Sequence, residues 1–170
     1  MRYSILLVIL LGTGSLGVAQ TTNDEQKAIE AQVDAFFTSW NKHDFSDMEN
    51  YVAKDCDFVN IVGMHWKGRE EVQYAHQASH EQIFKDIPLE KRSVTVRFLK
   101  PDCAIAHVLM HLMGAYIAPD GSKAGDNDAL ATFAFVKRNA VWMVEAVENV
   151  VVNEAARPFN PVKIRQKSKK

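Results

Sequence analysis

The sequence predicts an α+β fold in which N-terminal helices pack on one side of a curved antiparallel sheet. Two observations carry this prediction. Apolar residues recur at helical spacing in the first half of the chain, and residues from 93 onward alternate as strands separated by short turns. The chain has 170 residues, of which 47% are hydrophobic and 24% charged, as is typical of one globular domain. This composition excludes a disordered, collagen-like or coiled-coil chain.

The first long helix is predicted to begin at Thr22, because Thr22 and Glu25 form a capping-box pattern. Its apolar residues recur three or four positions apart, so they share a face that needs a broad partner such as a sheet; they are Ile29, Val33, Phe36, Phe37 and Trp40. The helix is expected to end near Lys42 and His43. Asp44 can then cap a short second helix that reaches Val52.

The rest of the chain is predicted to hold one more helix and a strand meander. Residues 57–66 indicate a strand with a bend or hairpin, and residues 69–85 indicate a third helix. Later strands are expected at 93–99, 104–117, 129–137 and 141–152, with a turn at 119–121 and a hairpin at 138–140. A curved sheet closed on one side by helices forms a cone whose open mouth is a common ligand site.

The first 19 residues have the features of a secretory signal, and the predicted domain follows as residues 23–153. Arg2 supplies the positive start, Ile5–Leu11 is apolar, and small residues at Gly17 and Ala19 favour cleavage after Ala19. The apolar run is shorter than the roughly 20 residues that span a bilayer. We therefore expect export to the periplasm or the exterior without stable membrane insertion, the alternative being an uncleaved interfacial anchor.

Charge separates the body of the chain from its C-terminal tail, residues 154–170. Residues 20–156 hold 13 basic against 21 acidic side chains, which disfavours a nucleic-acid partner. From Arg157 onward the tail is basic; we expect it to be solvated, with contact to lipid or an acidic surface as the alternative. Cys56 and Cys103 are too few for a disulfide-rich scaffold, and either a disulfide or two free thiols is open.

Several motifs occur in a characteristic order. They are Trp40-Asn41-x-x-Asp44, then Asp57-Phe58-Val59-Asn60-x-x-Gly63-x-x-Trp66-x-Gly68-Arg69, then His76-x-x-x-His80-x-x-x-Phe84, then Val94-x-Val96-Arg97-Phe98-Leu99-x-Pro101-Asp102-x-Ala104, and finally Trp142-x-Val144-x-Ala146-x-x-Asn149. Over residues 24–153 this pattern resembles the SgcJ/EcaC branch of the SnoaL-like proteins, in the nuclear transport factor 2-like superfamily.

The resemblance implies a cone-shaped, cystatin-like α+β fold, a homodimer packed through the sheet, and an internal pocket for a small and often apolar molecule. The superfamily includes isomerases, cyclases, dehydratases, binding proteins and assembly domains, so the fold does not decide the function. The related steroid isomerases use a Tyr on the first helix and an Asp on the first strand. Those positions fall on Phe36 and Asn60, which cannot perform that proton chemistry.

His76 and His80 are the candidate catalytic residues. They lie four residues apart on the third predicted helix and so share a face, with His76 near the middle of its apolar arc. An imidazole exchanges protons near neutral pH, so these side chains suit acid/base work on a ligand. The alternative is a structural role that holds the helix to the sheet.

Further residues are candidates for binding a ligand: Asn60, Trp66, His107, His111 and Asn149. Asn149 falls on the opposite face of its strand from Glu148, and solvent exposure is favoured for both Glu145 and Glu148. His107 and His111 share a strand face but lie roughly 13 Å apart along it, too far to bind one metal together. A zinc site formed by His76, His80 and one of these strand histidines is an alternative. We assign no metal site.

These observations predict an exported pocket protein that binds a small, partly apolar molecule. It is expected to need no cofactor for any acid/base chemistry of isomerase, dehydratase or hydrolase type. Two other classes stay open. One is a non-catalytic dimerisation module whose pocket is filled by side chains, and the other is a metal-dependent enzyme.

Overall fold

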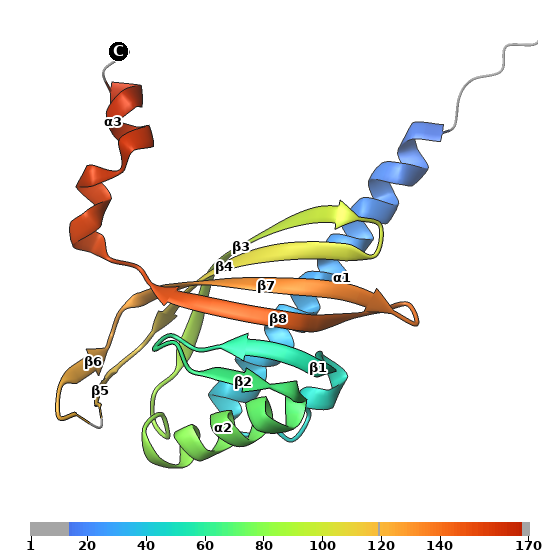
Figure 1. Cartoon of the computed structure of the whole chain (residues 1–170). Coiled ribbons are helices and arrows are strands. Elements are labelled where there is room, and N and C mark those ends of the chain that lie inside the picture. Colours follow the sequence, from blue (N-terminus) through green and yellow to red (C-terminus); the bar gives the residue numbers. More distant parts are fainter. Residues whose placement is uncertain (1–13, 119, 168–170) are drawn as a thin grey trace, which may run out of the picture.

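The structure is a computed structural model and describes residues 14–118 and 120–167 (Figure 1). Three helical elements precede or interrupt the first strands: α1 (Gly14–Lys42), the 3-10 turn η1 (Met48–Asn50) and α2 (Gly68–Gln82). The strands are β1 (Val52–Val59), β2 (His65–Lys67), β3 (Leu89–Lys100), β4 (Cys103–Leu112), β5 (Ala115–Ile117), β6 (Lys123–Gly125), β7 (Asp128–Arg138) and β8 (Val141–Val151). The turn η2 (Glu154–Phe159) and helix α3 (Pro161–Lys167) follow.

Six strands form one sheet in the order β2-β1-β8-β7-β4-β3, while β5 and β6 pair separately. The expectation of a wholly antiparallel sheet is wrong at one place, since β1 runs parallel to β8. A parallel neighbour needs a long crossover connection, and α2 together with the β3–β7 meander supplies it. The first and last strands of the domain thereby become neighbours, so the sheet is mixed.

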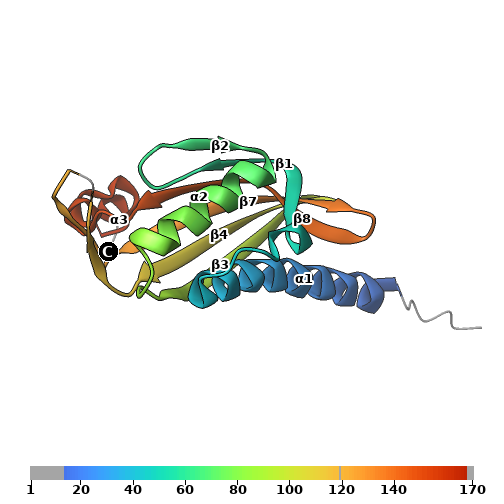
Figure 2. The ribbon, with the colours of Figure 1, turned by 90° about the horizontal axis from the view of Figure 1, so that it is seen from below.

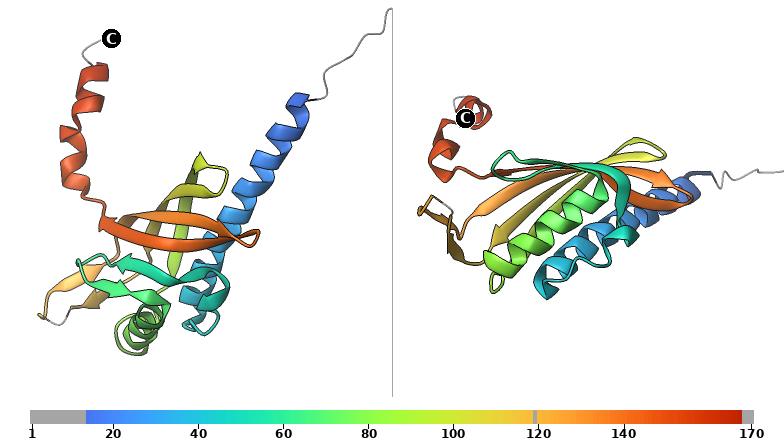
Figure 3. Two further views of the ribbon diagram at one scale, coloured as in Figure 1. Left: turned by 45° about the vertical axis from the view of Figure 1, so that its right-hand side comes forward. Right: turned by 60° about the horizontal axis from the view of Figure 1, so that its bottom comes forward.

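Helices α1 and α2 lie side by side across one face of the sheet (Figures 2 and 3). Of the α1 residues predicted to share a face, Trp40 is partly buried and the other four are buried there, as are Phe133 and Phe135 of β7 and Trp142 of β8. Burying a large apolar side chain stabilises a fold by about 1.5–3 kcal/mol. The predicted α+β architecture with helices on one face of a curved sheet is therefore confirmed.

Helix α1 begins at Gly14, upstream of the predicted start at Thr22. The carboxylate of Glu25 does not serve as a cap but accepts hydrogen bonds from Lys137 Nζ and Trp142 Nε1, each at 2.6 Å. The bond from Lys137, followed by that from Trp142, holds the pKa of Glu25 below its usual range. These contacts tie the first helix to the β7–β8 hairpin.

Other boundaries also differ from the predictions. The expected second helix is the single turn η1, and Val52 already belongs to β1. The expected strand 104–117 is divided into β4 and β5, because the chain bends at Met113 and Gly114 toward the separate β5–β6 pair. The predicted hairpin at 138–140 is confirmed, with Asn139 and Ala140 in left-handed conformations at φ 49° and 66°.

Strand β8 contains one more residue than its partner β7 requires. Ala134 pairs with Ala146 and Phe135 pairs with Val144, so Glu145 is left without a partner across the ladder. Such a bulge reverses which alternate residues face the core. Trp142 and Val144 face inward before it, and Val147 is the buried residue after it.

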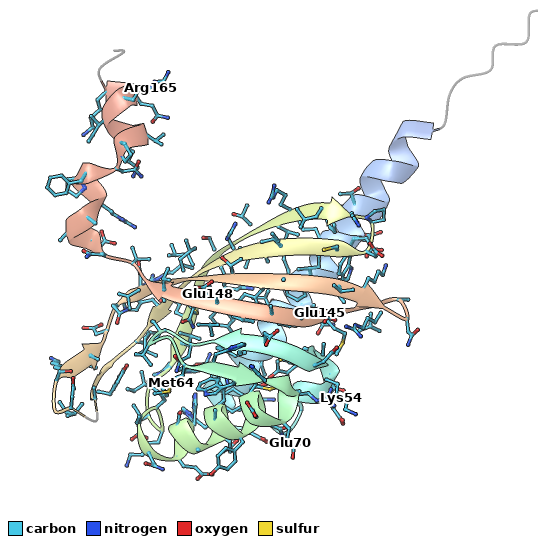
Figure 4. All side chains as sticks on the ribbon, viewed as in Figure 1. Lys54, Met64, Glu70, Glu145, Glu148 and Arg165 are labelled. Carbon is cyan, nitrogen blue, oxygen red and sulfur yellow. The ribbon has the colours of Figure 1, made fainter. Side chains whose placement is uncertain are left out.

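The C-terminal segment η2–α3 stands away from the sheet and carries Arg165 (Figures 3 and 4). None of its residues is buried, and Phe159, Val162 and Ile164 are exposed apolar side chains. Both cysteines are free thiols, with Cys56 buried. Within the described ranges, no helix has the combined length and hydropathy that a membrane crossing requires. Most of the predicted signal, residues 1–13, lies outside the described residues.

Gly125 of β6 has no room for a side chain, so even alanine at this position would strain the backbone. Its φ is +83°, and an added Cβ would lie 2.5 Å from the Gly114 carbonyl oxygen. We expect Gly125→Ala to destabilise the fold by about 3 kcal/mol in urea unfolding, because strain and a backbone clash add. Gly121 is the matched control, since its φ is also +83° but its Cβ would meet nothing within 4 Å. Gly121→Ala should cost only about 1 kcal/mol, and equal losses for both would refute the clash.

Candidate functional site

A cavity of about 240 Å³ lies between the sheet and the two long helices, with Tyr116 of β5 and Gly125 of β6 at its wall. Five of the seven predicted site residues line it, namely Asn60, Trp66, His76, His80 and Asn149. The other lining residues are mostly apolar, and none of the described lining residues carries a formal charge; they are Phe36, Trp40, Phe58, Ile61, Val62, Ser79, Phe84, Leu89, Met110, Leu112, Tyr116, Ala124, Gly125, Asn127, Ala129 and Val151.

His76 is buried on α2 and has a defined tautomer. Its Nδ1 lies 2.7 Å from the carbonyl oxygen of Val72, so Nδ1 carries the proton and donates. The rings of Phe36, Phe45, Phe58 and Trp66 surround it at centroid distances of 4.8–5.7 Å. Burial lowers the pKa of His76 to about 4. At neutral pH this imidazole is therefore uncharged, and its Nε2 is an acceptor.

His80 lies one helical turn further along α2 and is only 2% exposed. Its Nδ1 is 2.8 Å from Nδ1 of His43, and its ring meets the Trp40 ring edge to face at 4.4 Å. Burial, followed by the proximity of His43 and His76, lowers the pKa of His80 to about 4. Its Nε2 is buried and has no hydrogen-bond partner in the described part of the chain.

Asn149 supplies a second unpartnered polar atom. It lines the cavity from β8, and its Oδ1 is buried without a hydrogen-bond partner among the described residues. Its inward position follows from the bulge at Glu145, which changes the face presented by the last third of β8. Glu148 is exposed on the same strand, and Glu145 is held outside by Arg138 at 2.6 and 2.8 Å (Figure 4).

Asn60 and Trp66 reach the cavity from the β1–β2 hairpin. Asn60 Oδ1 accepts from the backbone N–H of Val62 at 3.1 Å and of Met64 at 2.8 Å, so it shapes the turn. The amide nitrogen of Asn60 is the part left for a ligand. Trp66 stacks on Phe58 at 5.6 Å, which makes a flat apolar wall.

His107 and His111 lie outside the cavity, contrary to the expectation that they bind its ligand. The inward residues of β4 are Ala104, Ala106, Val108 and Met110, so both histidines occupy the opposite face of the sheet. His107 Nδ1 is 3.2 Å from Thr132 Oγ1, and His111 Nδ1 is 2.8 Å from Asp128 Oδ1. Neither can join His76 and His80 around one ion.

His43 is one of the residues beside the cavity that the sequence analysis does not predict. It ends α1 in a left-handed conformation, with φ 55°, and places its ring against His80. Nothing in the sequence indicates this contact, because the two histidines belong to different helices. Tyr116 and Asn127 were also missed, since they reach the cavity from the short β5–β6 region. Across the described residues, no group of three or more His, Cys, Asp or Glu is gathered as a metal site.

Comparison with known proteins identifies the family. The model of the SnoaL-like domain matches residues 29–147. The chain belongs to the SnoaL-like domain family. A Caulobacter vibrioides protein with a cystatin-like fold is 34% identical to this SnoaL-like chain, with 81% of this chain and 96% of that chain covered and a TM-score of 0.77. No curated protein matches the sequence.

Two more distant structures share the fold. A domain of unknown function from Nostoc punctiforme is 23% identical, covers 85% of this SnoaL-like chain and 92% of its own, and has a TM-score of 0.66. A nuclear transport factor 2-like protein from Novosphingobium aromaticivorans is 15% identical, with 89% and 98% covered and a TM-score of 0.70. Both are described as cystatin-like, which agrees with the predicted fold.

The buried histidines predict an acid-sensitive fold. Because the folded-state pKa of His76 is about 4 against an ordinary 6.5, the unfolded chain takes up a proton first as the pH falls. Stability present above about pH 6.5 is therefore lost toward pH 4, by no more than about 3 kcal/mol for this group. In urea unfolding at several pH values, His76→Leu should make the free energy of unfolding fall less between pH 6.5 and pH 4 than it does in the wild type. His107→Leu on the outer face is the control and should keep the wild-type slope; a His76→Leu slope equal to wild type would contradict the assignment.

Proposed function

We propose that this protein binds a small, uncharged molecule with an apolar body and a polar group. The observation that carries the proposal is the pair of buried, unpartnered polar atoms, His80 Nε2 and Asn149 Oδ1, on residues that line one cavity. Leaving a buried polar atom unpaired costs about 1–3 kcal/mol. A ligand hydroxyl can donate to Asn149 Oδ1 or to His80 Nε2, and a ligand carbonyl can accept from His80 Nε2 when that nitrogen carries the proton; each such bond removes that cost.

The charge and size of the cavity support this ligand class. Its described lining residues carry no formal charge, and burial keeps His76 and His80 neutral, so nothing compensates a carboxylate or phosphate. A volume of about 240 Å³ is somewhat below the ~300 Å³ at which drug-sized pockets begin, which suits a small ligand. The aromatic wall of Phe58 and Trp66 favours a planar body.

The proposed chemistry is acid/base catalysis of isomerase, dehydratase or hydrolase type, with no organic cofactor. His76 and His80 are the candidate groups because each has a ring nitrogen available beyond its protein contact. A non-catalytic dimerisation module is the second candidate. The open volume between the sheet and the helices favours a ligand site over that module, in which side chains fill the pocket.

Three further proposals concern the subfamily, the location and the oligomeric state. The order of the motifs supports membership of the SgcJ/EcaC branch. The apolar run and small residues before Gln20 support export to the periplasm or the exterior, with cleavage after Ala19, inside the span of α1. The outer face of the sheet supports a homodimer, since Leu109, Leu130 and Val150 are cross-strand neighbours and form an apolar row there.

Ligand binding is tested with three two-ring probes of similar size. We expect 1-naphthol and 1-tetralone to quench the fluorescence of Trp40 and Trp66, which line the cavity, on binding. The carboxylate of 1-naphthoate should bind at least about 100-fold more weakly because its charge is buried unpaired. Asn149→Leu should weaken 1-naphthol about tenfold by removing one hydrogen-bond acceptor.

The matched control is Glu148→Gln on the outer side of the same strand, which should bind all three probes like wild type. Equal binding of 1-naphthoate and 1-naphthol would refute the uncharged cavity. Failure of both neutral probes at millimolar concentration would refute this ligand class and favour the dimerisation module.

Dimerisation through the outer face is tested by light scattering during size-exclusion chromatography. Leu130 is 39% exposed and lies between Leu109 and Val150. Leu130→Glu should weaken the dimer at least about tenfold, because a charge is buried against an apolar row. Val162→Glu on the exposed C-terminal segment is the control and should stay dimeric. A wild-type protein that is monomeric at all concentrations would contradict the proposal.

A further inference from the structure

The two histidines in contact beside the cavity come from different helices. His43 ends α1 and His80 lies on α2, and their Nδ1 atoms are 2.8 Å apart. Each neutral imidazole has one protonated nitrogen, so this contact holds a single proton that belongs to one ring or the other. If His80 Nδ1 donates, His80 Nε2 is an acceptor. If His43 Nδ1 donates, His80 Nε2 carries the proton and is a donor.

The backbone conformation at His43 is unusual, and it directs the His43 ring toward His80. Left-handed helix ends usually carry glycine, yet here a histidine occupies φ 55°. The loop is held from α2, because Gln77 Nε2 donates to the His43 carbonyl and Gln77 Oε1 accepts from the Phe45 N–H, each at 3.3 Å. A strained position that is fixed by its neighbours points to a role for its side chain.

His80 joins this pair to the cavity. Its Nε2 is the buried atom without a partner in the described chain, while its Nδ1 faces His43, which is partly exposed. His76 has no comparable outlet, since its Nδ1 proton is directed at the Val72 carbonyl of its own helix. Of the two cavity histidines, only His80 is connected through a second ring toward solvent.

We propose that His43 is a positioning residue for His80: the proton shared by their Nδ1 atoms decides whether His80 Nε2 donates to or accepts from a ligand in the cavity. The inference rests on the proposed function. A proton can also pass along this path. When a ligand hydroxyl gives its proton to His80 Nε2, the Nδ1 proton of His80 moves to His43 Nδ1, and His43 Nε2 releases its proton to water. Both rings end neutral, and the ligand anion, which no cavity residue compensates, is transient: it takes a proton back from His80 Nε2 as the reverse path returns one from water to His43 Nε2.

The first test reads the ring nitrogens of 15N-histidine-labelled protein by NMR. In the free protein, a 15N–15N coupling through the hydrogen bond should join the two Nδ1 atoms, and its absence would overturn the proposal. With 1-tetralone, which only accepts, His80 Nε2 and His43 Nδ1 should be protonated. With 1-naphthol, which donates, His80 Nδ1 and His43 Nε2 should be protonated instead. An unchanged tautomer of His43 in the two complexes would also overturn the proposal.

The second test separates pairing from packing. It uses an Asn149→Leu background, so that His80 is the unpartnered polar atom left for the probe. His43→Leu should lower the affinity for 1-naphthol relative to 1-tetralone several-fold. His80 Nδ1 is then unpaired in both complexes, but without His43 the neutral imidazole keeps its ordinary preference for a proton on Nε2, which suits a ligand that accepts and not one that donates. His43→Asn should restore the wild-type ratio, since its amide tolerates the left-handed backbone and pairs with His80 in either sense.

Each failure has a separate meaning. Equal weakening of both probes by His43→Leu, with no rescue by asparagine, would assign His43 to packing alone and overturn the proposal. If neither probe quenches the fluorescence of Trp40 and Trp66 in the wild-type protein, the proposed function fails, and the pairing of His43 with His80 is then decided by the coupling in the free protein. His65, which is exposed and bonded to Asp57 at 2.7 Å, is the internal control whose ring signals should not respond.

Discussion

One extra residue in the last strand decides which side chains the cavity receives. Up to Val144, the residues of β8 that face the core include Trp142, whose indole also anchors Glu25 of α1. Past the bulge at Glu145, the inward set shifts by one position and includes Asn149. A regular strand would bury one of these two side chains and expose the other. The bulge thus lets one strand serve both the core and the site, while Arg138 holds the Glu145 carboxylate outside.

The second constraint is the apolar enclosure of α2. Aromatic rings surround His76 and His80, and burial keeps both imidazoles uncharged at neutral pH. Neutral rings are tolerated there because each Nδ1 has a partner, Val72 for His76 and His43 for His80. The same pairing leaves the Nε2 atoms as the nitrogens available for chemistry. The apolar residues around the cavity therefore favour uncharged ligands, and the Nδ1 contacts leave Nε2 as the histidine nitrogen that a ligand can contact.

Local patterns were sufficient to predict much of the fold. The helical spacing of Ile29 to Trp40 identified the buried face of α1, and the helical period likewise brought His76 and His80 to the cavity side of α2. The strand histidines were misplaced for a physical reason. A period of two shows that His107 and His111 share a face, but apolar residues flank them on both faces of β4, with Ile105 and Leu109 on theirs and Ala106 and Val108 on the other. Sequence alone does not say which face is the core.

Features that depend on distant parts of the chain were not predictable. The parallel pairing of β1 with β8, the bulge at Glu145 and the contact of His43 with His80 each join segments whose meeting is set by the whole sheet. Glu25 shows the same limit, because a capping-box pattern marked it as a helix start while its carboxylate binds Trp142 and Lys137. Its partners lie more than a hundred residues away, at separations of 112 and 117.

The two cavity histidines therefore differ in what they can do, although sequence spacing treats them alike. A proton accepted by a buried imidazole leaves a positive charge in apolar surroundings, and that charge is costly unless it is passed on. His76 has only a backbone carbonyl behind it, which cannot take a proton, so it suits lining and orienting a ligand. His80 has a second imidazole behind it, so it can exchange its proton and return to neutrality. An uncharged cavity can support proton transfer when a residue that lines it can pass a proton on toward solvent. In this fold His80 passes it to His43, the residue at the end of the first helix.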